Sequence, residues 1–151
     1  MPSTRAEVIE FLDAFQAAER AGADAVGRWL TICGDPRLRG GLRVIRARGR
    51  RHAALAEQRL RALGGSPTAA VGRALAALCE VVGDSGIADR SKLAMLLARA
   101  PTSRRSSLGD ALARLTGDPE TQALFVSIDE DDQASLDWLR GMRDLIERES
   151  P

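Results

Sequence analysis

Three side chains able to bind a metal ion fall on the apolar stripes of three predicted helices. Glu19 lies on the first stripe, His52, the only histidine of the chain, lies on the second, and Asp132 lies on the third. Burying an ionised carboxylate is costly unless it is paired, hydrogen-bonded or bound to a metal. Two carboxylates and one imidazole with open positions suit a single iron, manganese or zinc ion. These three residues are therefore a candidate metal site.

The stripes are defined by apolar residues that recur at intervals of three and four, which is typical of one face of a helix. Polar or side-chain-free residues interrupt each stripe near its middle, so we expect a buried polar layer inside a helical bundle. The stripes comprise Ile9, Leu12, Phe15, Gly22, Val26, Trp29 and Cys33; Leu42, Ile45, Gly49, His52, Ala56, Leu60 and Leu63; and Phe125, Ile128, Asp132, Ser135, Leu139, Met142 and Ile146.

The first two helices are expected to be antiparallel neighbours, because only the short sequence CGDP separates them. At about 1.5 Å per residue, Glu19 and His52 lie roughly 21 and 24 Å from that turn. The two side chains therefore belong to the same layer. The alternative to a metal is a satisfied polar core, in which Glu19, His52 and Asp132 hydrogen-bond one another or pair with an inward arginine such as Arg50.

The composition favours an all-α fold in one domain, residues 1–151. Tyrosine is absent and β-branched residues are sparse, whereas alanine, leucine, arginine and glutamate are abundant. Ser3 or Thr4 is expected to cap the first helix, and Asp35 with Pro36 to begin the second. Helices are predicted over 5–32, 36–63, 68–82, 87–99, 106–115 and 119–148.

Charge and cysteine usage narrow the range of partners. The formal net charge is only +1, which disfavours a nucleic-acid partner, and the arginine run from Arg37 to Arg51 lacks interleaved aromatic residues. Acidic residues of a neighbouring helix, Asp129 to Asp131, are expected to pair with some of these arginines. Cys33 and Cys79 fit reduced, buried thiols. The N-terminal sequence has no signal-peptide or membrane-anchor pattern, which favours a cytoplasmic protein without a membrane partner.

Three segments together resemble the ferritin-like superfamily, in its rubrerythrin-like and uncharacterised bacterial branches. They are FQAAERAGADAVGRWL in the first helix, LRVIRARGRRHAALAEQRLRALGG in the second and DEDDQASLDWLR in the last. The resemblance implies an antiparallel four-helix bundle, here with an interrupted middle region. It also implies a dimetal site made from one Glu on each of two helices and a Glu-x-x-His pair on each of the other two.

The ligand set that the resemblance implies is incomplete in this chain. Glu19 matches the first glutamate and His52 the first histidine, but Gly49 stands where the paired glutamate is expected. In the last helix the pair becomes Asp132 and Ser135, which keeps a carboxylate and loses the imidazole. Asp89 and Asp110 are the available substitutes for the glutamate of the middle region.

We therefore expect a ferritin-like helical protein that has lost most of the dimetal ligands. In this interpretation the protein is non-catalytic, binds no cofactor and acts by dimerisation or by binding a protein partner. The alternative is a metal-binding oxidoreductase or metal-handling protein that uses Glu19, His52 and Asp132 to hold a single iron, manganese or zinc ion.

Overall fold

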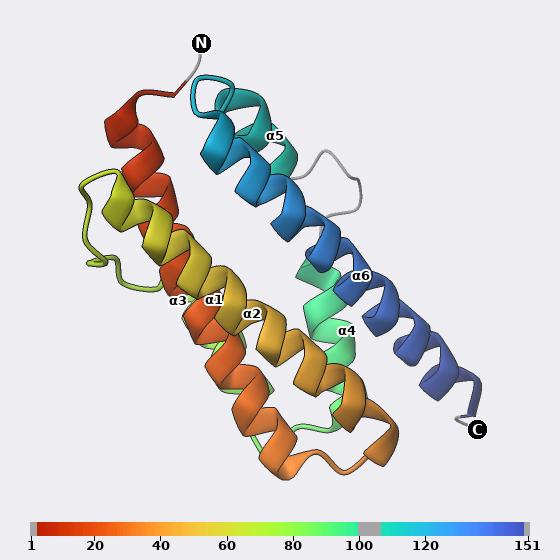
Figure 1. Ribbon diagram of the computed structural model, residues 1–151. Coiled ribbons are helices and arrows are strands. Elements are labelled where there is room, and N and C mark those ends of the chain that lie inside the picture. Colours follow the sequence, from red (N-terminus) through yellow and green to blue (C-terminus); the bar gives the residue numbers. More distant parts are fainter. Residues whose placement is uncertain (1–2, 100–106, 150–151) are drawn as a thin grey trace.

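The computed structural model describes residues 3–99 and 107–149, and every regular element in these ranges is a helix (Figure 1). The all-α prediction is confirmed for this part of the chain. Its helices are α1 (Arg5–Ile32), α2 (Pro36–Ala62), α3 (Arg73–Val82), α4 (Asp89–Arg99), α5 (Ser107–Arg114) and α6 (Pro119–Glu149).

The first two helices begin where the sequence predicts. The Thr4 hydroxyl accepts a hydrogen bond from the Glu7 backbone N–H, and the Glu7 carboxylate accepts one from the Thr4 N–H, which forms a capping box. Asp35 caps α2, and Pro36 occupies its first turn. Only residues 33–35 connect the end of α1 to the start of α2, and this short turn makes the two helices an antiparallel pair (Figure 1).

The prediction of a helix over 68–82 is wrong at its start, because α3 begins only at Arg73. α2 ends at a Schellman turn, in which Gly64 has a φ of 92° and the Gly65 N–H donates to the Leu60 carbonyl. The chain then runs along α1, where the Asp13 carboxylate accepts hydrogen bonds from the backbone N–H groups of residues 68 and 69. These bonds hold the segment in a non-helical conformation.

The other helix ends match the predictions or differ from them by one or two residues. α4 begins at Asp89 rather than at residue 87, and α6 extends to Glu149. The predicted start of the fifth helix, residue 106, lies outside the described residues. None of the described helices is long and apolar enough to cross a bilayer.

Five of the helices form a closed ring of neighbours. α1 packs against α2, α2 against α6, α6 against α4, α4 against α3, and α3 returns to α1 (Figure 1). α5 packs against α6 outside this ring. The segment between α2 and α6, predicted as the interrupted middle of a four-helix bundle, therefore adds two members to the ring.

The α2–α6 pair is antiparallel, and polar contacts mark its register. Near the C-terminal end of α2, the Arg59 guanidinium donates to Asp118, Glu120 and Thr121. Near the other end, the Trp138 ring lies against the backbone of α2 at Gly41. These contacts position the acidic middle of α6 opposite the middle of α2.

Two apolar clusters fill the interior, one on each side of the middle layer. One cluster contains Trp29, Leu42 and Leu139, all of which are buried. The other contains Leu12 and Phe125, also fully buried. Between the two clusters lie the candidate metal ligands, Glu19 on α1, His52 on α2 and Asp132 on α6.

Gly41 provides a test of the α2–α6 packing. A Cβ atom built at Gly41 lies 2.0 Å from Trp138 Cζ2, whereas one built at Gly40 meets nothing within 4 Å. We expect Gly41→Ala to lower the free energy of unfolding by about 1–3 kcal/mol, because Trp138 must move in a packed interface. Gly40→Ala is expected to raise it by about 0.5–1 kcal/mol, because alanine favours the helix. Denaturant unfolding monitored by far-UV circular dichroism measures both, and equal stability of the two variants would contradict this packing.

Candidate metal centre

His52 is the centre of the polar layer. It lies on α2, its side chain is 2% exposed, and its Nε2 lies 2.8 Å from Asp131 Oδ2 on α6. Because an ionised carboxylate only accepts hydrogen bonds, Nε2 carries the proton in this contact. His52 Nδ1 is buried and has no hydrogen-bond partner.

Two further carboxylates face the unpartnered nitrogen. Glu19 Oε2, from α1, lies 3.6 Å from His52 Nδ1, and Asp132 Oδ1, from α6, lies 3.8 Å from it. Both distances are too long for a hydrogen bond. One ligand atom from each of the three residues lies within 4.8 Å of the others. The structure therefore brings together the three predicted ligands from three helices.

The carboxylates are less buried than the stripe pattern predicts. The Glu19 side chain is 23% exposed and that of Asp132 is 40% exposed, whereas His52 is enclosed. The prediction of a buried polar layer holds for the imidazole, whereas the two acids are only partly buried. A position at the edge of the core leaves the charged groups in contact with water, which lowers the cost of desolvation.

The charges in this layer shift one another's protonation. Burial and the neighbouring Glu19 carboxylate raise the pKa of Asp132 to about 7. Burial opposes a charge on His52, but the attraction of the Glu19 and Asp132 carboxylates and the hydrogen bond to Asp131 outweigh it and raise the pKa of the imidazole. The contact with His52 lowers the pKa of Asp131. Near neutral pH the negative charge of the three carboxylates therefore exceeds the positive charge that His52 can supply.

The packing at Gly49 leaves little room for a larger side chain on α2, three residues before His52. A Cβ atom at this position lies 3.2 Å from the Ala23 Cβ and 3.5 Å from the Glu19 carbonyl oxygen. α1 therefore occupies the space that a longer side chain needs. The close approach of α1 and α2 at Gly49 and Ala23 also brings Glu19 within reach of His52.

The remaining predicted participants have other roles. Ser135 accepts a hydrogen bond from Arg48 Nη1 at 3.0 Å. Asp89 accepts hydrogen bonds from Trp29 Nε1 and from backbone N–H groups of the α1–α2 turn, far along α1 from the site. Asp110 is exposed on α5, and Arg50 is exposed on α2, so the proposed pairing of Arg50 with the polar layer is not observed.

Asp131 is the functional residue that the stripe pattern missed. Periodicity places Asp132 on the apolar face and its neighbour beside that face, yet α6 is oriented so that both residues flank the imidazole. Asp131 also lies 4.0 Å from Arg51, which is the kind of pairing expected between the acids of this helix and the arginines of α2. The acidic run 129–132 opposite a basic helix is the signal that points to it.

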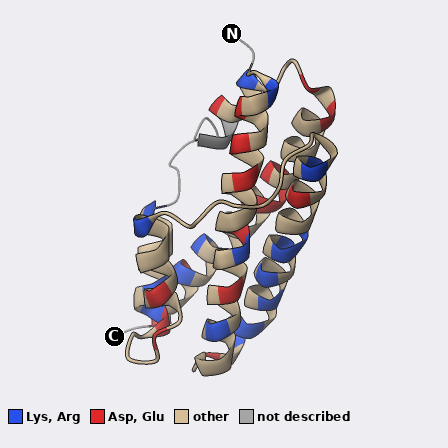
Figure 2. Ribbon diagram, turned by 90° about the vertical axis from the view of Figure 1, so that its left-hand side faces the viewer, with Lys and Arg blue, Asp and Glu red and all other residues tan. Residues whose placement is uncertain are grey.

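The arginine run is partly neutralised within the protein. Figure 2 shows basic residues along most of α2, with few acidic residues on the same helix. Arg37 pairs with Asp35 and Glu149, and Arg39 donates to the Cys33 carbonyl. These contacts agree with the expectation that part of the run is paired intramolecularly.

The two cysteines are free and buried, as predicted. Burial raises the pKa of both thiols, so neither supplies a thiolate ligand near neutral pH.

Comparison of the chain with protein-family models, with curated proteins and with solved structures gives no significant match. The function must therefore be argued from the site itself.

The raised pKa of Asp132 makes the folding stability of the metal-free protein depend on pH. Its pKa is near 3.8 when unfolded and about 7 when folded, so ionisation favours the unfolded state. Its contribution to stability is present below about pH 4 and is lost as the pH rises to 7. His52, with its raised pKa, acts in the same direction above about pH 6.5.

We expect Asp132→Asn to flatten this decline, by less than the full shift implies because 40% of the side chain is exposed. Urea unfolding with chelator present, at intervals from pH 4 to pH 8, measures the difference between wild type and variant. Glu130→Gln, an exposed neighbour, is the control. Parallel curves for wild type and Asp132→Asn would contradict the assignment.

Proposed function

We propose that this protein binds a single divalent metal ion through Glu19, His52 and Asp132. One observation supports the proposal above the others: the buried Nδ1 of His52 has no hydrogen-bond partner and faces two carboxylates. A buried polar atom without a partner is costly. A cation between these three groups removes that cost and balances the acidic charge.

The distances in the layer fit a shared ion with small side-chain adjustments. Atoms that bind one ion at about 2.0–2.2 Å lie roughly 3.0–3.6 Å apart. The distances from His52 Nδ1, 3.6 and 3.8 Å, lie at and just above the upper end of that range, and the three ligand atoms lie within 4.8 Å of one another, so an ion must draw them together. One nitrogen and two carboxylate oxygens suit manganese, iron or zinc, and three protein ligands leave coordination positions open.

The second nitrogen of His52 has the partner that metal-binding histidines usually have. Ligating imidazoles almost always donate their other N–H to a carboxylate or carbonyl, which fixes the tautomer and directs the free lone pair at the ion. Asp131 accepts such a bond from Nε2. We assign Asp131 to orient His52 and not to bind the ion.

The ferritin-like relationship remains part of this proposal. The antiparallel α1–α2 pair, with a glutamate on one helix facing a histidine on the other, supports it. The dimetal chemistry of that superfamily is not carried over. Gly49 has no room for the paired glutamate, and the described residues contain no further cluster of three ligands.

The non-catalytic interpretation, with dimerisation or binding of a protein partner, stays a prediction. It makes the polar layer a structural network in which Glu19, Asp131 and Asp132 stabilise His52 without a metal. Metal binding by the purified protein separates the two interpretations.

Metal titration tests the proposal. Chelator-treated protein is expected to bind one Mn²⁺, Fe²⁺ or Zn²⁺ per chain, and a bound ion is expected to raise the melting temperature. His52→Ala and Glu19→Gln are expected to abolish stoichiometric binding, because each removes one of three ligands. Asp131→Asn is expected to weaken binding about 10–100-fold, as for other residues that orient a ligand.

Calorimetry and elemental analysis measure stoichiometry and affinity, and Glu130→Gln is the matched control. Substitution of an exposed acid on the same helix should leave both unchanged. Wild-type protein without stoichiometric metal after reconstitution would refute the proposal, and so would undiminished binding by His52→Ala.

A further inference from the structure

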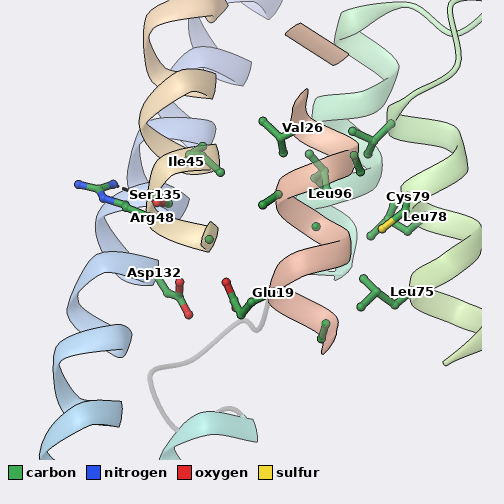
Figure 3. Close-up of a pocket in the computed structure, with 16 residues that line it drawn as sticks. Glu19, Val26, Ile45, Arg48, Leu75, Leu78, Cys79, Leu96, Asp132 and Ser135 are labelled. Atoms are coloured by element: carbon green, nitrogen blue, oxygen red, sulfur yellow. Dashed lines mark hydrogen bonds between the residues drawn. The ribbon is translucent and has the colours of Figure 1, made fainter. Parts of the chain in front are cut away.

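The ring of five helices encloses a cavity next to the proposed metal site. Its volume is about 300 Å³, and residues from α1, α2, α3, α4 and α6 line it (Figure 3). Glu19 and Asp132 lie at one end with their carboxylates directed toward each other, while Leu75, Leu78 and Cys79 come from α3 on another side. Two of the three proposed metal ligands, Glu19 and Asp132, thus line the same cavity as a group of apolar side chains.

Small residues on α1 leave this space open. Ala18, Gly22 and Ala25 line the cavity, and a Cβ atom built at Gly22 meets nothing within 4 Å. A bundle normally fills such a position with side chains. Here the space persists beside partly exposed acids, so its polar end is in contact with solvent.

Charge at the polar end determines what a ligand needs there. Glu19 and Asp132 repel an anionic head group when no cation is present. Arg48, the one cationic residue that lines the cavity, donates to Ser135 and extends away from Glu19 in Figure 3. A divalent ion between the two carboxylates cancels their charge, and its open positions accept oxygen donors.

We propose that the cavity binds a compact aliphatic molecule whose terminal oxygen coordinates the metal ion held by Glu19, His52 and Asp132. This inference rests on the proposed function and names the class of ligand for the same site. The apolar chain occupies the space beside Gly22 and Leu78, and the oxygen head group lies at the open end. A hydroxyl and a carboxylate share the required chemistry.

The volume limits the size of the ligand. A water molecule, which has one non-hydrogen atom, takes up roughly 30 Å³. A cavity of about 300 Å³ therefore holds about ten non-hydrogen atoms. Octan-1-ol and octanoate have this size. Each methylene group removed from the chain is expected to weaken binding about fourfold, because less apolar surface is buried.

Cobalt provides a direct readout of coordination. Protein loaded with Co²⁺ is titrated with octan-1-ol and, separately, with octanoate, while visible absorption follows the ligand field of the ion. We expect at least one of the two to change the cobalt spectrum and to bind at least tenfold more tightly than to metal-free protein. The two arms distinguish a neutral from an anionic head group, and octylamine, an ammonium ion near neutral pH, is expected to leave the spectrum unchanged.

A variant that fills the cavity tests the location. Gly22→Leu is expected to retain the cobalt spectrum of the unliganded protein and to weaken binding of the eight-carbon probe at least tenfold. Gly141→Leu, at an exposed position of α6 that is equally free of neighbours, is the matched control and should bind as wild type. If Gly22→Leu alters cobalt uptake itself, Val26→Phe, further along the same wall, takes its place.

The outcomes separate this inference from the proposed function. Protein that binds cobalt but responds to neither oxygen probe refutes the ligand assignment and leaves the metal site standing. Equal probe affinity with and without cobalt, or unchanged affinity in the cavity-filling variant, also refutes it. Protein that binds no cobalt refutes the metal site, and this is seen before any probe is added.

Discussion

The buried imidazole of His52 lies between the two apolar clusters, where each of its ring nitrogens needs a polar partner. His52 is enclosed by α1, α2 and α6, and only one of its nitrogens has a hydrogen-bond partner, Asp131. The other nitrogen faces Glu19 and Asp132. The neighbouring carboxylates oppose ionisation of Asp132 and favour a positive charge on His52, which is why the pKa values of both groups are raised. A cation at the unpartnered nitrogen is the simplest way to balance this arrangement.

The backbone geometry needed for this layer comes from residues without side-chain chemistry. Gly49 and Ala23 let α1 and α2 approach closely enough for Glu19 to face His52. Gly41 lets α2 and α6 approach closely, because the Trp138 ring occupies the space that a Cβ atom at residue 41 would need. A larger residue at either glycine separates helices that carry the candidate ligands. Gly49 therefore meets a packing requirement between α1 and α2.

The sequence predicts the all-α fold and the helix caps well, because capping residues and apolar periodicity are local signals. It also predicts that Glu19, His52 and Asp132 meet, since a short turn and helical rise place the first two at one depth. The start of α3 is not predictable in this way. It depends on hydrogen bonds from residues 68 and 69 to Asp13, which is distant in sequence.

The role of Asp131 and the cavity were missed for a related reason. The rotation of α6 about its axis decides whether one or two adjacent acids reach His52. The spacing of apolar residues does not define that rotation closely enough to distinguish the two cases. The cavity arises because α3 and α4 enlarge the ring of neighbours, and neither short helix carries a pattern that specifies its partner. Such packing follows from contacts between segments that no local pattern connects.

An anomalous-difference map from crystals soaked in Mn²⁺ or Zn²⁺ shows directly whether an ion binds in this layer. We expect one strong peak per chain, bonded to His52 Nδ1 with Glu19 and Asp132 as the other protein ligands, and with Asp131 still hydrogen-bonded to Nε2. A map without a peak in this layer, or with the ion bound elsewhere while His52 hydrogen-bonds directly to the surrounding carboxylates, would contradict the proposed metal site.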